Sequence, residues 1–293
     1  MKKINYLLVV LFTISLFVGC KKTEEDTTPA NEVFMASTAP TTRTAVLEDF
    51  TGVRCGFCPD GHVIAKAIKD ANPDKFIIIA THANLYAKPA AGWANFTTPM
   101  GTAIDAQAKP AGYPAGTINR ATALSLGANA ANASYSDMTM YRDQWTKAAA
   151  KAMSMTAPVN IGAKATYDAA TKKITVKVDM YYTADETVAN NINVALLQDG
   201  LKSKQSGSSD PNYVQNHVLR DMATGNWGVV ITEPTTTGSK IKGKSFTFDV
   251  PEYYNGSDPV TGGGKAVIDN MKVVVYVTRG QKNILNSVEV DVK

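Results

Sequence analysis

The first half of the chain carries apolar runs that are typical of buried strands. Residues 45–50 and 75–81 are largely apolar, as in strands that are covered on both faces of a parallel sheet. Between these runs, apolar residues recur at the spacing of one helix face: Ile64, Ala65, Ala67, Ile68 and Ala71. A strand, a helix and a second strand in this order predict an α/β domain over residues 44–156.

Two further elements are expected in this domain. Residues 115–120 have the composition of a short strand, and residues 121–126 are expected to pair with it as a hairpin. The alanine-rich residues 137–153 have the periodicity of an amphipathic helix, which we expect to close the domain.

From residue 157 onward, apolar and polar residues alternate, as they do in strands with one buried face. The alternation is clearest in three sets: Ile174, Val176, Val178 and Met180; Phe246, Phe248 and Val250; Met271, Val273, Val275 and Val277. About seven or eight such strands, separated by Asn, Gly, Asp and Pro turns, predict an antiparallel sandwich. Residues 157–293 are therefore expected to form an all-β domain that is immunoglobulin-like in broad architecture.

The N-terminus has the pattern of a targeting segment. Lys2 and Lys3 precede an apolar run over residues 6–18, which is too short to span a bilayer comfortably. Residues 1–19, followed by Cys20, resemble a bacterial lipoprotein signal, which implies cleavage before Cys20 and lipidation of that cysteine. A plain secretory leader is the alternative. The polar, Thr- and Pro-rich residues 20–43 are expected to be a flexible tether.

Composition narrows the possible functions. The 293 residues have a net charge of +4, and removing Lys2 and Lys3 with the leader lowers it to +2. This small charge gives no reason to expect nucleic-acid binding. The chain has three cysteines. If Cys20 carries a lipid anchor in the membrane, Cys55 and Cys58 remain as an isolated pair in an oxidising envelope compartment.

The cysteine pair is expected at the first turn of the helix, just after the turn that follows the first strand. The unpaired backbone N–H groups and the positive end of the helix dipole favour a thiolate there, so we expect the pKa of Cys55 to be lowered. Two intervening residues bring the second sulfur within bonding reach of the first. Cys55 can then attack a disulfide and Cys58 can resolve the mixed intermediate, so that the only redox group needed is the Cys55–Cys58 disulfide and no cofactor is expected.

Other readings of the pair are an inert structural disulfide and a metal site. A closed zinc site usually needs a second cysteine pair or closely spaced histidines, and no other cysteine follows Cys58. Copper bound by Cys55, Cys58 and His82 is a more distant alternative, because thiolates and imidazole suit copper.

The surroundings of the pair resemble the thioredoxin superfamily. Asp49 precedes Cys55 by six residues, where thioredoxins place a buried acid that handles the proton of the second cysteine. Tyr113-Pro114, followed by a strand-like segment, resembles the cis-proline step that faces the cysteine pair in that superfamily. The resemblance implies that Asp49 moves a proton and that Pro114 orders the backbone of a protein substrate.

The same resemblance implies which residues contact a protein client. Gly56 and Phe57 lie between the cysteines, in place of the Gly-Pro of thioredoxin, and Tyr113 precedes the expected cis-proline. His82 directly follows the second strand, and the carboxyl ends of parallel strands line the ligand crevice of an open sheet. His82 is therefore expected near Cys55, although a strand-capping role is the alternative.

A second polar cluster lies in the predicted sandwich, where His217 and Arg220 form a possible second site or a structural cluster. Asn216 to Arg220, together with the leader and the Thr-Gly-x-x-Cys-x-x-Cys-Pro motif at residues 51–59, resembles one family. This is the twenty-eight-kilodalton outer-membrane-protein family of Gram-negative lipoproteins. The resemblance implies a lipid-anchored protein of the cell envelope, in the outer membrane.

Two functions of different class follow from these observations. The first is an envelope thiol-disulfide oxidoreductase with a protein thiol or disulfide client, in which Cys55 is more exposed and more acidic than Cys58. The second is an adhesin-like binding lipoprotein, in which the thioredoxin-like domain is a scaffold and the disulfide is structural. We favour the first, because an inert scaffold needs neither Asp49 nor Pro114 beside the cysteines.

Overall fold

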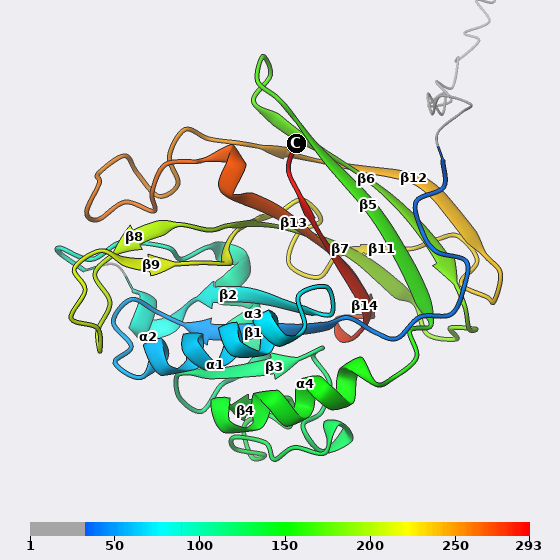
Figure 1. The fold of residues 1–293 in the computed structure, drawn as a ribbon, viewed down its shortest axis with the longest axis horizontal. Coiled ribbons are helices and arrows are strands. Elements are labelled where there is room, and N and C mark those ends of the chain that lie inside the picture. The colour runs from blue at the N-terminus through cyan, green and yellow to red at the C-terminus, as the bar shows by residue number, and fades with distance from the viewer. Residues whose placement is uncertain (1–32, 89) are drawn as a thin grey trace, which may run out of the picture. The chain divides into compact units, whose positions relative to one another are not determined.

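The computed structural model describes residues 33–88 and 90–293 (Figure 1). The expected signal at residues 1–19 and the lipidation site Cys20 lie outside the described residues. Within the part of the chain that is described, no helix is long and apolar enough to cross a membrane.

The first half contains the expected parallel strands. β1 (Ala45–Thr51) and β2 (Phe76–His82) pair in parallel, and α1 (Cys58–Ala71) connects them. Every residue of the two strands is buried, which explains their largely apolar sequences. β3 (Ala115–Ile118) pairs antiparallel with β1. The remaining elements of this half are α2 (Asn84–Ala87), α3 (Pro99–Ala108), η1 (Leu124–Leu126), β4 (Thr139–Tyr141), η2 (Arg142–Gln144) and α4 (Trp145–Met153).

Two predicted elements of this half differ from the structure. Residues 121–126 do not pair with β3; they turn back through η1, and β4 takes the place beside β3. Because residues 139–141 are used in that strand, the helix expected over residues 137–153 begins only at Trp145.

The sheet continues from the first half of the chain into the second. Its strand order is β14-β13-β7-β10-β2-β1-β3-β4, and β11 also pairs with β7. The strands contributed by the second half are β7 (Asn190–Gln198), β10 (Val218–Met222), β11 (Val229–Val230), β13 (Met271–Arg279) and β14 (Lys282–Asp291). β10 joins the two halves, since it pairs parallel with β2 and antiparallel with β7.

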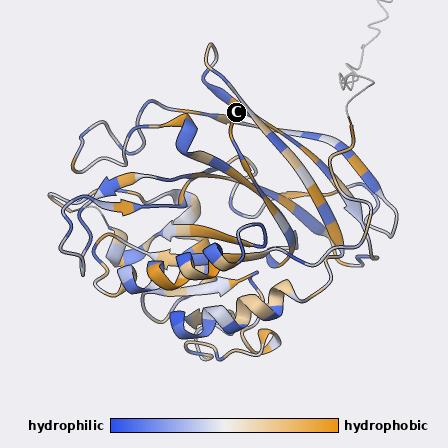
Figure 2. Ribbon diagram, viewed as in Figure 1, coloured by the Kyte–Doolittle hydropathy of each residue, from blue (hydrophilic) through white to orange (hydrophobic). Residues whose placement is uncertain are grey.

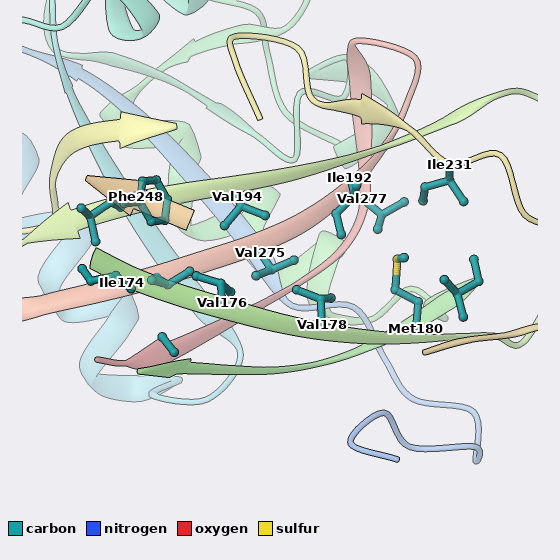
Figure 3. Packing of buried hydrophobic residues seen from close by; sticks show 14 of the residues in the cluster. Ile174, Val176, Val178, Met180, Ile192, Val194, Ile231, Phe248, Val275 and Val277 are labelled. Carbon is teal, nitrogen blue, oxygen red and sulfur yellow. The ribbon is translucent and has the colours of Figure 1, made fainter. Parts of the chain in front are cut away.

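The second half also forms a three-stranded sheet that packs on the shared sheet. Its strands are β5 (Val159–Asp168), β6 (Lys173–Tyr182) and β12 (Lys240–Asp249). Hydrophilic and hydrophobic residues alternate along them in Figure 2. Their apolar face meets side chains of β7 and β13, including Ile192, Val194, Val275 and Val277 (Figure 3). The expected separate sandwich therefore shares one of its two layers with the α/β half. The fold combines one mixed sheet, which contains the parallel β1–α1–β2 unit, with smaller antiparallel sheets.

Helices cover both faces of the sheet around β1 and β2. α1 and α4 pack on one face, against residues such as Leu47, Phe76 and Ile78. α3 packs on the other face, where the core contains residues from both halves of the chain: Val46, Phe50, Ile77, Ile79, Ala195, Leu197, Val274 and Tyr276. The boundary at residues 156 and 157 stays a prediction, but the halves on its two sides share this core.

Residues 35–42, expected in the tether, contact β5 and β6. The backbone N–H of Met35 donates to Asp179 Oδ2 at 2.8 Å, and Thr42 forms a bridge with Thr156. The backbone of Met35 comes so close to Gly162 that a Cβ on this glycine would lie 2.4 Å from the Met35 carbonyl carbon. The missing side chain of Gly162 thus makes room for the segment.

A buried arginine, paired with a glutamate of the first half, also hydrogen-bonds to a tyrosine of the second half. Arg120 Nη2 donates to Glu48 Oε1 at 2.6 Å and to the hydroxyl of Tyr276 at 3.0 Å. Thr117 also donates to Glu48, at 2.9 Å. Glu48 lies on β1 and Tyr276 on β13, so one arginine connects an early strand with a late one.

Replacing Arg120 with Ala is expected to lower the free energy of unfolding by about 3–5 kcal/mol, because it leaves the Glu48 carboxylate buried without its partner. Denaturant unfolding monitored by circular dichroism measures this loss. Lys66→Ala is the control, since the Lys66–Asp70 pair is exposed and contributes at most about 1 kcal/mol. Equal losses in the two variants would contradict the prediction.

Candidate active site

Cys55 and Cys58 form a disulfide in the turn between β1 and α1. α1 begins at Cys58, so Cys55 lies in the turn before the helix rather than in its first turn. Both cysteines are buried, with 1% and 0% of their surface exposed, whereas Phe57 between them is 70% exposed. The expectation that Cys55 is more exposed than Cys58 does not hold in this oxidised state.

A hairpin from the second half of the chain lies on the cysteine turn. It consists of β8 (Leu201–Ser203), β9 (Tyr213–Gln215) and the β8–β9 loop, which we define as residues 204–212. In Figure 1 the hairpin reaches the end of the sheet at which β1 and β2 finish and α1 starts. The hairpin therefore lies against the turn that carries the two buried cysteines.

Three residues of the β8–β9 loop contact the backbone of the cysteine turn. Gln205 Nε2 donates to the carbonyl oxygen of Cys55 at 2.9 Å and to that of Gly52 at 3.2 Å. The Ser206 N–H donates to the Val53 carbonyl at 2.8 Å. Gly207 lies against Gly56: a Cβ on Gly207 would be 2.0 Å from the Gly56 carbonyl oxygen. Gly56 is therefore in contact with the chain's own loop.

Asp49 faces α1 from β1 and is 1% exposed. Burial raises the pKa of its carboxyl group to about 7. Its Oδ2 lies 3.8 Å from Nε2 of His62, which follows Cys58 by one helical turn. Its Oδ1 has no hydrogen-bond partner among the described residues. A carboxyl group with this pKa can both give and take a proton near neutral pH.

His62 is held by two hydroxyl groups. Its Nε2 lies 3.0 Å from Thr51 Oγ1, and its Nδ1 lies 2.9 Å from the Tyr213 hydroxyl. Burial, with a smaller effect of His217, lowers the pKa of His62 to about 4. The imidazole is therefore neutral at pH 7, and it connects the helix of the cysteine pair with the β8–β9 hairpin.

The chain has three histidines, and His82 and His217 both lie close enough to His62 to interact with it electrostatically. His82 is buried at the end of β2 and packs edge-on against Phe96. Burial, then the nearby His62 and Arg220, lower its pKa to about 3. His217 is partly buried, and burial lowers its pKa as well.

A cavity of about 550 Å³ opens beside the buried carboxyl. Asp49, His62, Tyr213 and His217 line it with polar atoms, and Ile78 with Ala80 form part of its apolar wall. Asp49 thus faces a space large enough for water, which gives its proton a route that does not pass through the disulfide.

Pro114 lies beside α1 and the Tyr113–Pro114 peptide bond is cis, as the thioredoxin resemblance implies. A Cβ on Gly61 would be 3.1 Å from the Pro114 Cβ, so the proline packs one turn beyond Cys58. The Tyr113 hydroxyl donates to Asp105 at 2.5 Å. Contact of Gly56, Phe57, Tyr113 or His82 with a client stays a prediction; of these, Phe57 is exposed and His82 is buried.

The structure separates the two residues of the possible second site. His217 lines the cavity beside Asp49, whereas Arg220 lines a different cavity with Tyr254. Arg220 donates to the Gly263 carbonyl at 2.7 Å, and its guanidinium lies 4.0 Å from the centre of the Tyr254 ring. Arg220 therefore positions the loop before β13, and only His217 belongs to the candidate site.

Metal binding gains no support from the geometry. Across residues 33–88 and 90–293, no group of three His, Cys, Asp or Glu side chains is arranged to hold a metal ion. The copper alternative therefore lacks a ligand set in this part of the chain.

Sequence reasoning missed His62, Tyr213 and Gln205 as site residues. The spacing of Cys58 and His62, four residues apart on one helix, is a signal that would have placed the histidine beside the cysteine. Gln205 lies in a polar loop about 150 residues from the cysteines, and no local pattern marks it.

Comparison with known proteins gives a family and a fold. The family model described as outer membrane protein Omp28 matches residues 101–293, which is more than half of the chain. No curated protein matches the chain.

Several solved structures are similar. HBP35 of Porphyromonas gingivalis is 19% identical with a TM-score of 0.63, over 86% of this chain and 76% of that one. Protein AGR_C_4864 from Agrobacterium tumefaciens is 11% identical with a TM-score of 0.51, over 86% and 96%. A domain of the outer membrane lipoprotein Omp28 from P. gingivalis is 23% identical with a TM-score of 0.32, over 47% and 89%. The first two show a shared fold.

The lowered pKa of His62 predicts how stability depends on pH. The unfolded chain binds a proton at this residue below about pH 6.5, and the folded chain does so only near pH 4, so folding loses stability as the pH falls between these values. Through this residue, the wild type loses on the order of 2 kcal/mol of its free energy of unfolding when the pH falls from 7 to 4.5. His62→Gln lacks the titrating group, so its stability relative to the wild type is expected to rise by that amount over the same interval. Urea unfolding at the two pH values measures this. A stability difference that is the same at both pH values would contradict it.

Proposed function

The chain belongs to the outer membrane protein Omp28 family, and on this premise we propose that it is an outer-membrane thiol-disulfide oxidoreductase whose working group is the Cys55–Cys58 pair. Members of the family are outer membrane proteins, so the expected location is confirmed. We further propose that Cys20 carries the lipid anchor and that the client is a protein with thiols or a disulfide.

The observation that carries this proposal is the buried carboxyl of Asp49. A buried acid without a charged partner costs folding free energy, and the pKa of about 7 shows how strongly burial disfavours its ionised form. A structural disulfide has no use for such a group. A thiol-disulfide exchange does, because a thiolate that leaves the disulfide must receive a proton at neutral pH.

The proposed reaction is a two-electron exchange with a protein dithiol. A client thiolate, whose proton has gone to solvent, attacks Cys55 Sγ, and the bond to Cys58 breaks. Cys58 leaves as a thiolate that takes the proton of Asp49, and Asp49 regains a proton from solvent through the adjoining cavity. The second client thiolate, whose proton has gone to solvent, then attacks the client sulfur of the mixed disulfide. Cys55 leaves and takes a proton from solvent, so the client is oxidised to a disulfide and the pair is reduced to two thiols.

The reverse reaction reduces a client disulfide, with Cys55 attacking and Cys58 resolving the intermediate. In the forward direction, a second disulfide-containing protein must reoxidise the pair. The parallel β1–α1–β2 unit, the antiparallel β3 and β4, and the cis-proline beside α1 support a thioredoxin-like arrangement of the site. The fold shared with HBP35 is consistent with this arrangement.

One observation favours the second candidate, a binding lipoprotein with a structural disulfide. Both cysteines are buried and the β8–β9 loop contacts the backbone of their turn, so no protein thiol reaches Cys55 in the described state. The two candidates differ in whether the pair exchanges with thiols at a useful rate, and this difference can be measured.

Asp49→Asn provides the test. The oxidised chain is mixed with a synthetic peptide that carries two thiols, and the loss of peptide thiols is followed over time. At pH 7 the variant is expected to react at least about tenfold more slowly, because the thiolate of Cys58 lacks its proton donor. The gap should close well above pH 7, where the wild-type carboxyl has also lost its proton.

Two controls accompany this experiment. Asp74→Asn changes an exposed carboxyl and should react like the wild type. Cys55→Ser should not react at all. If the wild-type chain leaves the peptide thiols unchanged while its disulfide stays intact, the scaffold candidate replaces the oxidoreductase.

A further inference from the structure

The β8–β9 loop closes the disulfide, and we propose that it is a lid that must withdraw from residues 52–56 before a thiol can attack Cys55. Its role in catalysis rests on the proposed function, but its contacts with the cysteine turn do not. Gln205 is the main positioning residue of this lid. It acts through the backbone of Cys55 and takes no part in the chemistry.

The closed state is specified by hydrogen bonds. Gln205 is 3% exposed and spans two carbonyl groups of the cysteine turn, Gly52 and Cys55. Its own amide oxygen accepts a hydrogen bond from Gln215 Nε2 at 2.7 Å. Both ends of the Gln205 amide are therefore engaged, and the side chain is fixed between β9 and the disulfide.

Because of the composition of the lid, opening it costs little free energy. Residues 204–212 read Lys-Gln-Ser-Gly-Ser-Ser-Asp-Pro-Asn, and they bury no large apolar side chain. β8 and β9 pair only with each other among the described strands. Each hydrogen bond to the cysteine turn contributes about 0.5–1.5 kcal/mol net, so the loop can leave without unfolding the core.

Gly207 allows the close approach. It has a φ of +83°, which favours glycine, and any side chain here would also collide with Gly56. Gly225 has a similar φ of +68°, but a Cβ there would meet nothing within 4 Å. Comparing alanine substitutions at these two glycines therefore distinguishes the effect of backbone strain from the effect of a collision with the cysteine turn.

The lid controls reactivity through the fraction of molecules in which it is open. A thiolate must approach Cys55 Sγ directly, and in the closed state this residue is 1% exposed. The observed rate of reduction is then the rate for an open site multiplied by the open fraction. Loosening the lid should raise this rate and leave the rest of the fold unchanged.

The experiment measures reduction of the full chain, in detergent, by excess dithiothreitol. Samples are alkylated at intervals, and the mass of the peptide with Cys55 and Cys58 gives the rate. Gln205→Ala and Gly207→Ala are expected to be reduced about tenfold faster than the wild type. This corresponds to a loss of about 1.4 kcal/mol in the free energy that favours the closed lid. Ser209→Ala, at an exposed position of the same loop, and Gly225→Ala should match the wild type.

Hydrogen exchange separates a lid from general destabilisation. In the two fast variants, amides of residues 204–212 and of the cysteine turn should exchange faster, while those of β1 and β2 keep their wild-type rates. If Gln205→Ala and Gly207→Ala were reduced at rates within twofold of the wild type, the lid proposal would be overturned. The same holds if Gly225→Ala were accelerated as much as Gly207→Ala. Neither outcome depends on Asp49→Asn, because reduction by dithiothreitol reports access to the disulfide and not turnover with a client.

Discussion

The site depends on hydrogen bonds between two segments that are about 150 residues apart. The carbonyl groups of Gly52, Val53 and Cys55 accept them, and Gln205 with Ser206 donate them. A turn that carries reactive sulfurs would otherwise expose these carbonyls to water. Because these contacts come from a polar loop and not from an apolar core, they contribute little free energy. Such a cover would suit the proposed exchange reaction, because it could withdraw without unfolding the core.

The shared sheet is what brings the loop to the cysteines. β10 pairs with β2, so the hairpin that precedes β10 is carried to the carboxyl ends of β1 and β2. The hydrogen bonds of Arg120 to Glu48 and Tyr276, together with the core around α3, fix the two halves in this relation. The second half of the chain is therefore not an appended sandwich. It supplies Tyr213, His217 and the lid to a site whose sulfurs come from the first half.

The local parts of the fold and of the site could be predicted from sequence. Apolar runs and helical spacing marked β1, α1 and β2, and the residues beside the cysteines pointed to Asp49 and Pro114. The cover on Cys55 could not be predicted, because Gln205 and Gly207 lie in a polar loop whose partner is set by sheet order. For the same reason, His217 and Arg220 were grouped by their spacing, although they face different cavities. A pattern within one helix or strand can be recognised in the sequence, whereas the pairing of strands across a sheet is fixed only by the whole fold.

The most direct test of the central claim is the midpoint potential of the Cys55–Cys58 pair. The full chain in detergent is equilibrated in graded thiol-disulfide buffers, and the redox state is read by alkylation and mass. An exchanging pair with a proton donor beside it predicts a midpoint between about −270 and −120 mV, the range of known thiol oxidoreductases. A pair that stays oxidised below about −300 mV would be a structural disulfide and would contradict the account.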